Sequence, residues 1–134
     1  LFAKALGESP IEILRGTDDF LAVFETEQQI QTMNPDFTKL AKINSRGVVI
    51  SAPGNDVDFV SRCFFPQTGV DEDPVTGSAH TMLIPYWAKQ LDKIEFKAHQ
   101  LSARGGVLDC KLINDRVLIS GKSIIYFEGM ISII

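Results

Sequence analysis

The chain has 134 residues, with 13 Lys or Arg against 17 Asp or Glu, so its formal net charge is −4 at pH 7. A chain of this length can form one globular domain, residues 1–134, with a core that needs neither a metal nor a disulfide. The acidic charge and the lack of a basic run disfavour nucleic acid and anionic membrane surfaces as partners. No apolar stretch approaches the roughly 20 residues that span a bilayer, so no membrane-spanning segment is expected.

The cysteines indicate the cellular compartment of the domain, and the hydropathy indicates that one of its faces is covered. Cys63 and Cys110 have no spacing typical of a metal or redox site, and two buried thiols fit a reducing cytoplasm. The mean hydropathy of +0.08 is high for an acidic domain, and the chain begins with Leu1 rather than Met. Both features suggest a fragment of a larger protein, with one face covered by the missing part.

The first third of the chain reads as a hairpin followed by two helices. Residues 11–15 and 20–24 are β-rich, and the turn sequence Gly16-Thr17-Asp18-Asp19 joins them. Residues 26–33 have few apolar positions and predict a short exposed helix. The helix-breaking sequence Asn34-Pro35-Asp36 then precedes a second helix, which the apolar spacing predicts over 37–43.

Most of the remaining chain reads as β-strands. The strand-like segments are apolar, β-branched or alternating, and they span 47–52, 58–65, 95–101, 107–113, 116–120 and 124–134. With the hairpin, they give seven or eight strands beside two or three helices. The fold class is therefore predicted as α+β with a mostly antiparallel sheet.

One segment, residues 78–91, interrupts the run of strands. It is apolar almost all the way round, which predicts a helix that is buried on every side and surrounded by strands. Pro85 lies in the middle of this helix, where proline removes a backbone hydrogen bond and clashes with the preceding turn. We therefore expect a kink or a restart of the helix at Pro85.

The stretch from Gly69 to His80 carries the candidate site, because it leads from a strand into this helix. Thr76 and Ser78 are suitable N-caps, and Gly77 allows the backbone to approach a ligand closely. The free N–H groups of the first helical turn favour an anion. A phosphate loop would need a lysine directly after Gly77, which is absent, so a carboxylate is the expected ligand.

Asp73 lies a few residues before the helix and is followed by the rigid Pro74. Beside an anion site, its carboxylate could perform acid/base chemistry or hold a substrate ammonium group. An ordinary turn before a capped helix would have the same sequence, so spacing alone leaves both interpretations open. The acidic run Asp71-Glu72-Asp73 lacks the alternating ligands and the distal Glu of a calcium loop, which favours solvated charge over a metal site.

The other reactive side chains are weaker candidates. Ser78 and His80 point to different faces of one helix, so they cannot form a nucleophile and base pair, and His80 is expected to be buried or capping. His99 has no partner at a useful spacing. The single Arg104-Gly105-Gly106 sequence in an acidic chain predicts a β-turn or bulge rather than an RNA-binding tract.

A set of motifs spread over the chain carries a family resemblance. The motifs are Arg62-Cys63-Phe64-Phe65-Pro66, Gly69, the unbroken segment from Glu72 to His80, Pro85-Tyr86-Trp87, the segment from Gln100 to Gly106, and Arg116-Val117. Together they resemble the PhzF-like (phenazine biosynthesis) isomerase/epimerase family, and Ala5-Leu6-Gly7 resembles the start of that family's second domain. Asp92 replaces a common glycine, which is compatible with a left-handed helix end.

The resemblance implies a diaminopimelate-epimerase-like fold, in which a curved antiparallel sheet or barrel surrounds a central buried helix in each of two domains. It also implies an active site in the cleft between the domains, without cofactor or metal. Carried onto this chain, it assigns Asp73 as the catalytic carboxylate, and Gly77 and Ser78 as ligands of a substrate carboxylate. Thr76 and Ala79 complete the predicted substrate-binding segment.

The family's first domain, which carries a catalytic Glu, has no counterpart in these residues, so the chain is expected to be the C-terminal half of a two-domain protein. The isolated chain should then have no turnover, because half a cleft lacks the main base. A non-catalytic binding or dimerisation module of the same fold is the alternative. An epimerase that uses two thiols is disfavoured, because no Cys lies between Gly69 and His80. The resemblance makes a homodimer plausible, and the apolar ending 131–134 could pair with another domain or protomer.

Overall fold

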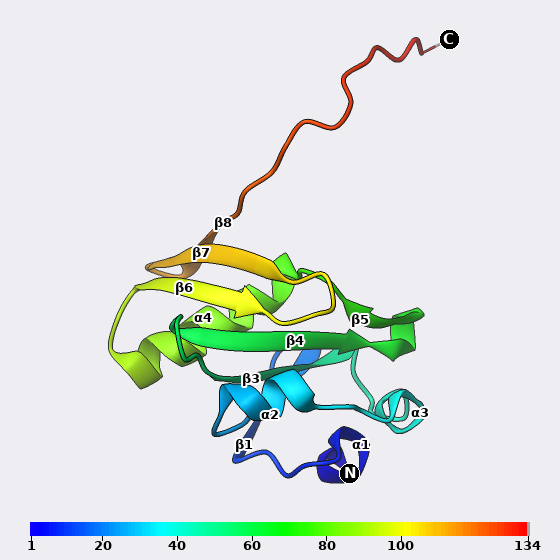
Figure 1. Cartoon of the computed structure of the whole chain (residues 1–134), viewed down its shortest axis with the longest axis vertical. Helices are drawn as coiled ribbons and strands as arrows, with labels where there is room; N and C mark the ends of the chain where they lie inside the picture. Colours follow the sequence, from blue (N-terminus) through cyan, green and yellow to red (C-terminus); the bar gives the residue numbers. More distant parts are fainter. Residues whose placement is uncertain (134) are drawn as a thin grey trace.

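Eight strands form one curved sheet that is not closed into a barrel. The computed structural model describes residues 1–133 of the chain. Within them the strand order is β1-β2-β3-β4-β6-β7-β8, with β5 paired to β4 outside this path (Figure 1). The bounds are β1 Glu12–Arg15, β2 Asp19–Val23, β3 Gly47–Pro53, β4 Phe59–Phe65, β5 Val70–Asp73, β6 Glu95–Gln100, β7 Gly106–Ile113 and β8 Arg116–Ser120.

The helices are α1 (Phe2–Leu6), α2 (Glu27–Thr32), α3 (Phe37–Leu40) and α4 (Gly77–Leu91), with a 3₁₀ turn, η1, over Pro66–Thr68. α1 precedes the first strand and the other helices lie between strands, which confirms the α+β class. The predicted hairpin is confirmed, because β1 and β2 pair antiparallel with Ile13 opposite Ala22. The short helix predicted over 26–33 is also confirmed, as α2, with Thr26 as its N-cap in a capping box with Gln29.

The pairing is mostly antiparallel, as predicted, but two pairs of neighbours run parallel. These are β2 with β3 and β4 with β6. Parallel neighbours need a crossover connection, and here α2 and α3 connect the first pair while β5 and α4 connect the second. The crossover through α4 places the start of this helix directly after β5.

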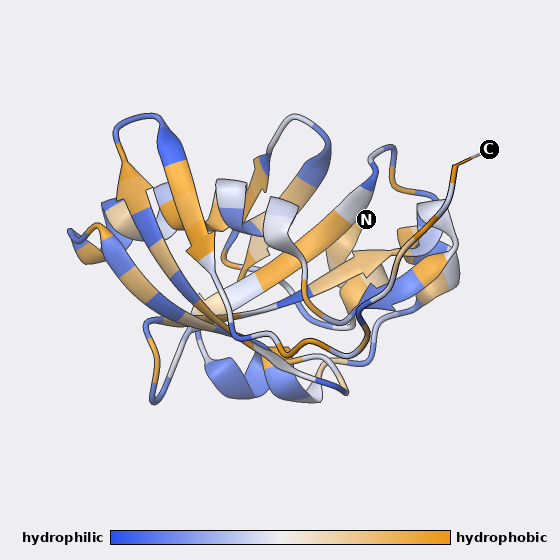
Figure 2. Ribbon diagram, turned by 90° about the horizontal axis from the view of Figure 1, so that it is seen from above, coloured by the Kyte–Doolittle hydropathy of each residue, from blue (hydrophilic) through white to orange (hydrophobic). Residues whose placement is uncertain are grey.

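The central strands separate two apolar cores, one on each face of the sheet. On β4, Phe59 and Cys63 pack on the side of α4, whereas Val60 and Phe64 pack on the side of α1, α2 and α3. A strand that is covered on both faces is apolar at successive positions rather than at alternate ones. Figure 2 shows hydrophobic stretches along the central strands, interrupted by hydrophilic positions.

α4 is the central helix, but the prediction that it is buried on every side is wrong. Its buried residues face the sheet, whereas its other side, which includes Ser78, Thr81, Pro85 and Lys89, is exposed. The sheet stays open between its edge strands β1 and β8, so no strand covers that side. Pro85 is an apolar residue on this exposed side, so the apolar pattern of the segment does not show which side faces solvent.

α4 also runs through Pro85 without interruption, so the expected restart does not occur. The proline removes the donor for the carbonyl of Thr81, and because Thr81 is exposed, water can take the place of that donor. Trp87 then fixes the helix to the sheet, because its Nε1 donates to Ser51 Oγ at 3.0 Å. The helix ends at Asp92, whose φ of 51° confirms the predicted left-handed end.

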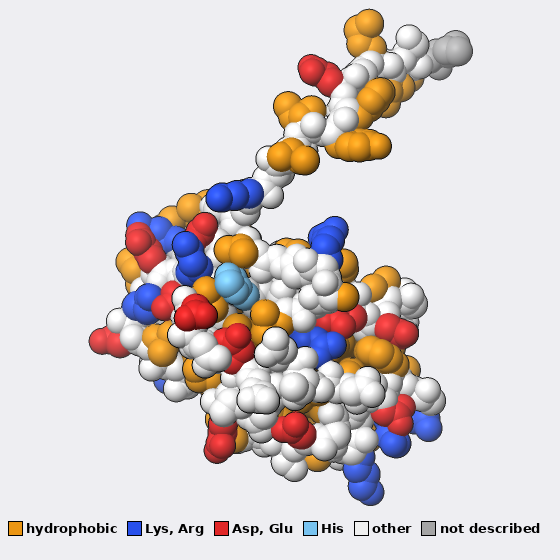
Figure 3. Space-filling model, viewed as in Figure 1, with side chains coloured by type: hydrophobic (Ala, Val, Ile, Leu, Met, Phe, Trp, Pro, Cys, Tyr) orange, Lys and Arg blue, Asp and Glu red, His pale blue; other side chains and the backbone are white. Residues whose placement is uncertain are grey.

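The segment after β8 does not form the strand that was predicted over 124–134. Residues 121–133, called here the C-terminal tail, have no helix or strand and extend away from the body of the molecule (Figure 1). Ile134 lies outside the described residues. The tail carries large apolar side chains in the open (Figure 3), from Phe127 at 81% exposed to Met130 at 100%. A strand forms only by pairing with a neighbouring strand, and the tail pairs with none of the described strands.

Within the described residues, no helix combines the length and the hydrophobicity that would be required to cross a membrane.

Candidate functional site

The candidate site lies where β5 ends and α4 begins, and a buried glutamine from β6 holds this junction. Gln100 is fully buried, and its Nε2 donates to the carbonyl of Asp73 at 2.8 Å. Its Oε1 accepts from the backbone N–H of Thr76, also at 2.8 Å. The short turn between Asp73 and Gly77 is therefore fixed by a side chain more than twenty residues further along the chain. Gln100 belonged to a recognised motif, but the sequence did not indicate this role.

Thr76 is the N-cap residue of α4, as predicted, although its hydroxyl does not cap the helix. Its backbone is extended, with φ −117° and ψ 101°, and no helix N–H donates to its side chain. The hydroxyl instead donates to Asp73 Oδ2 at 2.5 Å. Ser78 is the second residue of the helix rather than a cap. The first-turn N–H groups are thus left without a side-chain acceptor.

Gly77 and Ala79, in the first turn of α4, differ in how closely a ligand can approach them. A Cβ atom built at Gly77 would have no other atom within 4 Å, so the space beside this residue is open, as its predicted role requires. Ala79 is only 1% exposed and its methyl group packs in the core on the α4 side. A ligand at this helix end could therefore contact Ala79 only through its main chain.

A cavity of about 220 Å³ brings the site residues together. Among the residues predicted from sequence, Asp73, Thr76 and Ser78 line it, whereas Gly77 lines a neighbouring hollow and Ala79 lies beneath the surface. The remaining lining residues are Arg46, Phe65, Thr68 and Val70. The cavity therefore joins one carboxylate, three hydroxyls and a guanidinium beside an aromatic ring.

Arg46 is the residue that sequence reasoning missed. It precedes β3, and its Nε donates to Asp19 Oδ1 at 2.9 Å while Nη2 donates to Asp19 Oδ2. The same Nη2 donates to Ser78 Oγ at 3.2 Å. The hydrogen bond to Asp19 raises the pKa of the Arg46 guanidinium further above its ordinary value, so the group carries a full charge. No motif marked this arginine, because its partners lie 27 and 32 residues away in sequence.

His80 lies beneath the start of α4 and has a structural role. It is fully buried, and its Nδ1 lies 2.8 Å from the carbonyl oxygen of Thr76. A carbonyl can only accept, so Nδ1 carries the proton. Burial lowers the pKa of His80 below its ordinary value, which keeps the ring neutral. This confirms the prediction of a buried histidine.

The remaining candidates also have structural partners. Burial raises the pKa of the Cys63 thiol to about 12, so this cysteine is an unreactive core residue. Glu72 was expected to be solvated, but it is paired with Arg62 at 2.7 Å, and both side chains are mostly buried. Over residues 1–133, no three or more His, Cys, Asp or Glu side chains are placed to hold a metal ion.

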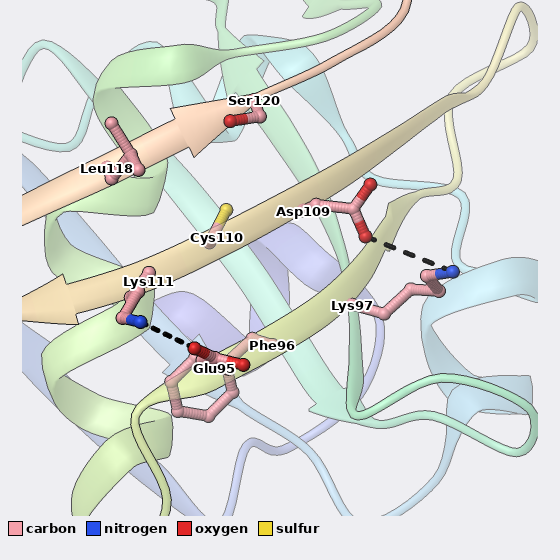
Figure 4. Close-up of a pocket in the computed structure, with 8 residues that line it drawn as sticks. All are labelled: Glu95, Phe96, Lys97, Asp109, Cys110, Lys111, Leu118 and Ser120. Atoms are coloured by element: carbon pink, nitrogen blue, oxygen red, sulfur yellow. Dashed lines mark hydrogen bonds and ion pairs between the residues drawn. The ribbon is translucent and has the colours of Figure 1, made fainter.

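A second hollow lies over β6, β7 and β8, away from these residues (Figure 4). Its charged side chains are matched in pairs: Lys111 with Glu95 at 2.6 Å and Lys97 with Asp109 at 3.9 Å. Exposed pairs of this kind contribute little energy and leave no unbalanced charge for a ligand. This hollow contains no residue of the candidate site.

The fold and the cavity define a class of protein: an α+β domain whose curved, open sheet packs on a central helix that starts beside a carboxylate. The family model named PhzC-PhzF, described as phenazine biosynthesis-like protein, matches residues 2–129. The chain belongs to this PhzF-like family, which confirms the family that the sequence motifs indicated.

Its relatives are similar over nearly the whole chain. An uncharacterized isomerase of Pseudomonas aeruginosa is 49% identical over 128 residues, which are 96% of this chain and 49% of that protein. A phenazine biosynthesis-like domain-containing protein of Bos taurus is 51% identical over 98% of this chain and 52% of its own length. The crystal structure of a PhzF-family phenazine biosynthesis protein from Enterococcus faecalis has a TM-score of 0.87 at 43% identity, covering 90% of this chain and 46% of that one. The chain thus spans about half the length of the curated relatives it matches.

Proposed function

We propose that this chain forms one wall of the active site of a cofactor-independent PhzF-like isomerase or epimerase, which moves a proton on a small carboxylate-bearing substrate. One observation carries the proposal: Asp73, Thr76 and Ser78 line a single cavity at the start of α4. The names of curated relatives as isomerases support the reaction class.

Asp73 is the group that transfers the proton. Its carboxylate can accept a proton from one position of the substrate and return it to another or to the opposite face. The hydroxyl of Thr76 donates to one of its oxygens, which holds the carboxylate in one orientation and leaves the other oxygen for the substrate. Positioning of this kind lowers the barrier by fixing the reacting groups before the reaction.

The first turn of α4 binds the substrate carboxylate. The N–H groups of Gly77, Ser78 and Ala79 have no side-chain acceptor within the described residues, and the helix dipole places partial positive charge there. The open space beside Gly77 allows an anion to approach this backbone. Ser78 adds a hydroxyl at the rim of the cavity.

The rest of the relatives' length supplies what this chain lacks. We infer that an N-terminal domain covers the cavity and contributes the main base, so that the isolated chain has no turnover. The chain spans 49% of the Pseudomonas relative, which leaves room for a domain of similar size.

Incorporation of deuterium from solvent tests this function without knowledge of the product. A longer protein that contains this sequence would be incubated in D₂O with a set of small carboxylates, and exchange into a carbon position would be followed by mass spectrometry. Asp73→Asn is expected to abolish the exchange, and Ser78→Ala to reduce it. Unchanged exchange in both variants would rule out the assignment, and exchange by this chain alone would rule out the need for a second domain.

The exposed tail favours a second candidate, a binding or dimerisation module of the same fold. Seven large apolar side chains between Ile124 and Ile133 are each at least 81% exposed, which is unusual for a surface with no partner. A homodimer that buries these side chains would be seen as a doubled mass in light scattering. A monomer at all concentrations would exclude this alternative for the isolated chain.

A further inference from the structure

The charge inside the candidate cavity sets a condition for binding an anion. Asp73 lines the cavity, so a substrate carboxylate that enters it meets a negative charge at short range. Unpaired like charges of this kind repel one another strongly when water is excluded. Arg46 is the one Lys or Arg among the residues that line the cavity, so it alone supplies an opposite formal charge.

Arg46 is held in place from two sides. Asp19 receives two hydrogen bonds from its guanidinium, and the Asp19 side chain is 6% exposed. The guanidinium also lies over the ring of Phe65, with 5.4 Å between its central carbon and the ring centroid. A bidentate pair and a stacked ring fix an arginine in one orientation. The Arg46 side chain nevertheless remains 39% exposed, so a ligand can reach it.

The contact with Ser78 determines which way the serine hydroxyl can donate. Arg46 Nη2 donates to Ser78 Oγ at 3.2 Å, so this oxygen accepts from the arginine. The hydroxyl proton of Ser78 has no acceptor within residues 1–133 and is free for a ligand. Arg46 Nη1 also donates to no side chain or carbonyl of the described residues, which leaves two N–H groups available.

We propose that Arg46 is a substrate-contacting residue that binds the substrate carboxylate together with Ser78 and so selects anionic over neutral substrates. This inference rests on the proposed function, because it assigns a further residue to the same anion site. Asp19 acts through Arg46 and is a positioning residue. The pair has no net charge, but Arg46 lines the cavity and Asp19 does not, so the pair presents its positive end to a ligand beside Asp73.

Binding of benzoate and of its neutral analogue benzamide tests the proposal on the chain as it is. Benzoate is chosen because Phe65 offers an aromatic wall. Dissociation constants would be measured from the NMR shifts of the Gly77, Ser78 and Ala79 amides. Arg46→Met should weaken benzoate by at least about tenfold and leave benzamide unchanged, because only the anion loses a charge-assisted hydrogen bond. Arg46→Lys should recover part of the loss.

Two further variants control for folding and for net charge. Arg46→Met leaves Asp19 buried without a partner, so the double variant Asp19→Asn, Arg46→Met removes both charges and is expected to fold and to lose benzoate in the same way. Arg116→Met removes an exposed arginine on β8 and should change nothing.

The outcomes separate this inference from the proposed function. If benzoate binds equally to wild type and Arg46→Met while Ser78→Ala weakens it, the role of Arg46 is overturned and the anion site stands. If benzoate shifts none of the three amides of the wild type, the anion site is wrong and the inference is overturned with it.

Discussion

His80 shows how a single residue ties the candidate site to the core. Its ring packs beside Phe59, with 6.1 Å between the ring centroids, and its Nδ1 donates to the carbonyl of Thr76, the residue that begins the helix. Nε2 is buried without a partner in the described part of the chain. A charged ring there would have one N–H with nothing to bind. The histidine is thus compatible with the fold only in its neutral form.

The neutral state of His80 predicts a loss of stability in acid. The folded-state pKa of His80 is lowered from its ordinary value of 6.5, and burial is the main cause. As the pH falls through 6.5, the unfolded chain takes up a proton that the folded chain does not, so folding becomes less favourable. We expect this group to reduce the free energy of unfolding by at most about 1.4 kcal/mol per pH unit below that point. Urea unfolding between pH 7 and pH 5.5, at half-unit steps, measures this fall in the free energy of unfolding, which should be about 1 kcal/mol in total.

His80→Asn provides the comparison, because its amide can still donate to Thr76 but does not titrate. Its free energy of unfolding should depend less on pH than that of the wild type. Val49→Ala, a core variant that keeps His80, should be less stable at every pH but retain the wild-type slope. Equal slopes in wild type and His80→Asn would show that His80 does not cause the acid sensitivity.

At the scale of elements, Arg62 fastens α2 to the sheet. From β4 its guanidinium pairs with Glu72 on β5 through two hydrogen bonds of 2.7 and 2.9 Å. Nη1 also donates to the carbonyls of Ile30 and Met33, at 3.1 and 2.7 Å, which satisfies the end of α2. One side chain thus joins a helix end, a central strand and the strand that leads to Asp73.

Arg62→Met should therefore destabilise the fold by about 2–4 kcal/mol, because it leaves Glu72 and two carbonyls without their donor in a mostly buried position. Urea unfolding measures the loss. Lys39→Met, which breaks an exposed pair with Asp36, is the control and should cost less than about 1 kcal/mol. A loss for Arg62→Met as small as that of the control would contradict a structural role for this pair.

Two glycines near the site are expected to respond oppositely to alanine. At Gly77 a Cβ meets no atom within 4 Å, so Gly77→Ala should preserve the fold or stabilise α4 by up to about 1 kcal/mol. At Gly106 a Cβ would lie 2.3 Å from Val75 Cγ2, so Gly106→Ala should cost about 1–3 kcal/mol. Thermal unfolding of both variants measures the difference. A marked loss of stability in Gly77→Ala would mean that the space beside this residue is not free.

Local pattern was enough to predict the elements whose own residues decide them. The hairpin before residue 24, the strands on both sides of residue 55 and the helix over 78–91 followed from turn residues and apolar spacing. β5 was missed because Val70–Asp73 is short and acidic, and it becomes a strand by pairing with β4. The parallel pairing of β2 with β3 was also missed, because local pattern does not show which strands become neighbours.

Part of the candidate site could be predicted from the sequence, and part of it could not. Asp73, Thr76 and Ser78 are close in sequence, and the structure brings them to one cavity. Asp19 begins β2 and Arg46 directly precedes β3, and the parallel pairing of these strands puts both residues beside α4. The local sequence around either residue gives no signal for a contact of that kind.

At the scale of the whole molecule, the C-terminal tail and the folded body should behave independently. The tail side chains from Ile124 onward are almost fully exposed, so they contribute no core packing. A chain ending at Gly121 should therefore unfold with a free energy within about 1 kcal/mol of the intact chain. Its apparent mass in light scattering should also rise less with concentration, because the exposed apolar surface is gone. A large loss of stability on truncation would show that the tail packs on the body in solution.

α4 lies in the middle of one core and also forms a wall of the cavity. Leu83, Ile84 and Trp87 keep the sheet folded, and the first turn of the same helix meets whatever enters the cavity. Unfolding of the core therefore destroys the cavity, and by thermodynamic linkage any occupant must raise the melting temperature. A compound present at one hundred times its dissociation constant adds about 2.7 kcal/mol. The natural substrate can thus be sought among small carboxylates by heating the protein with each of them.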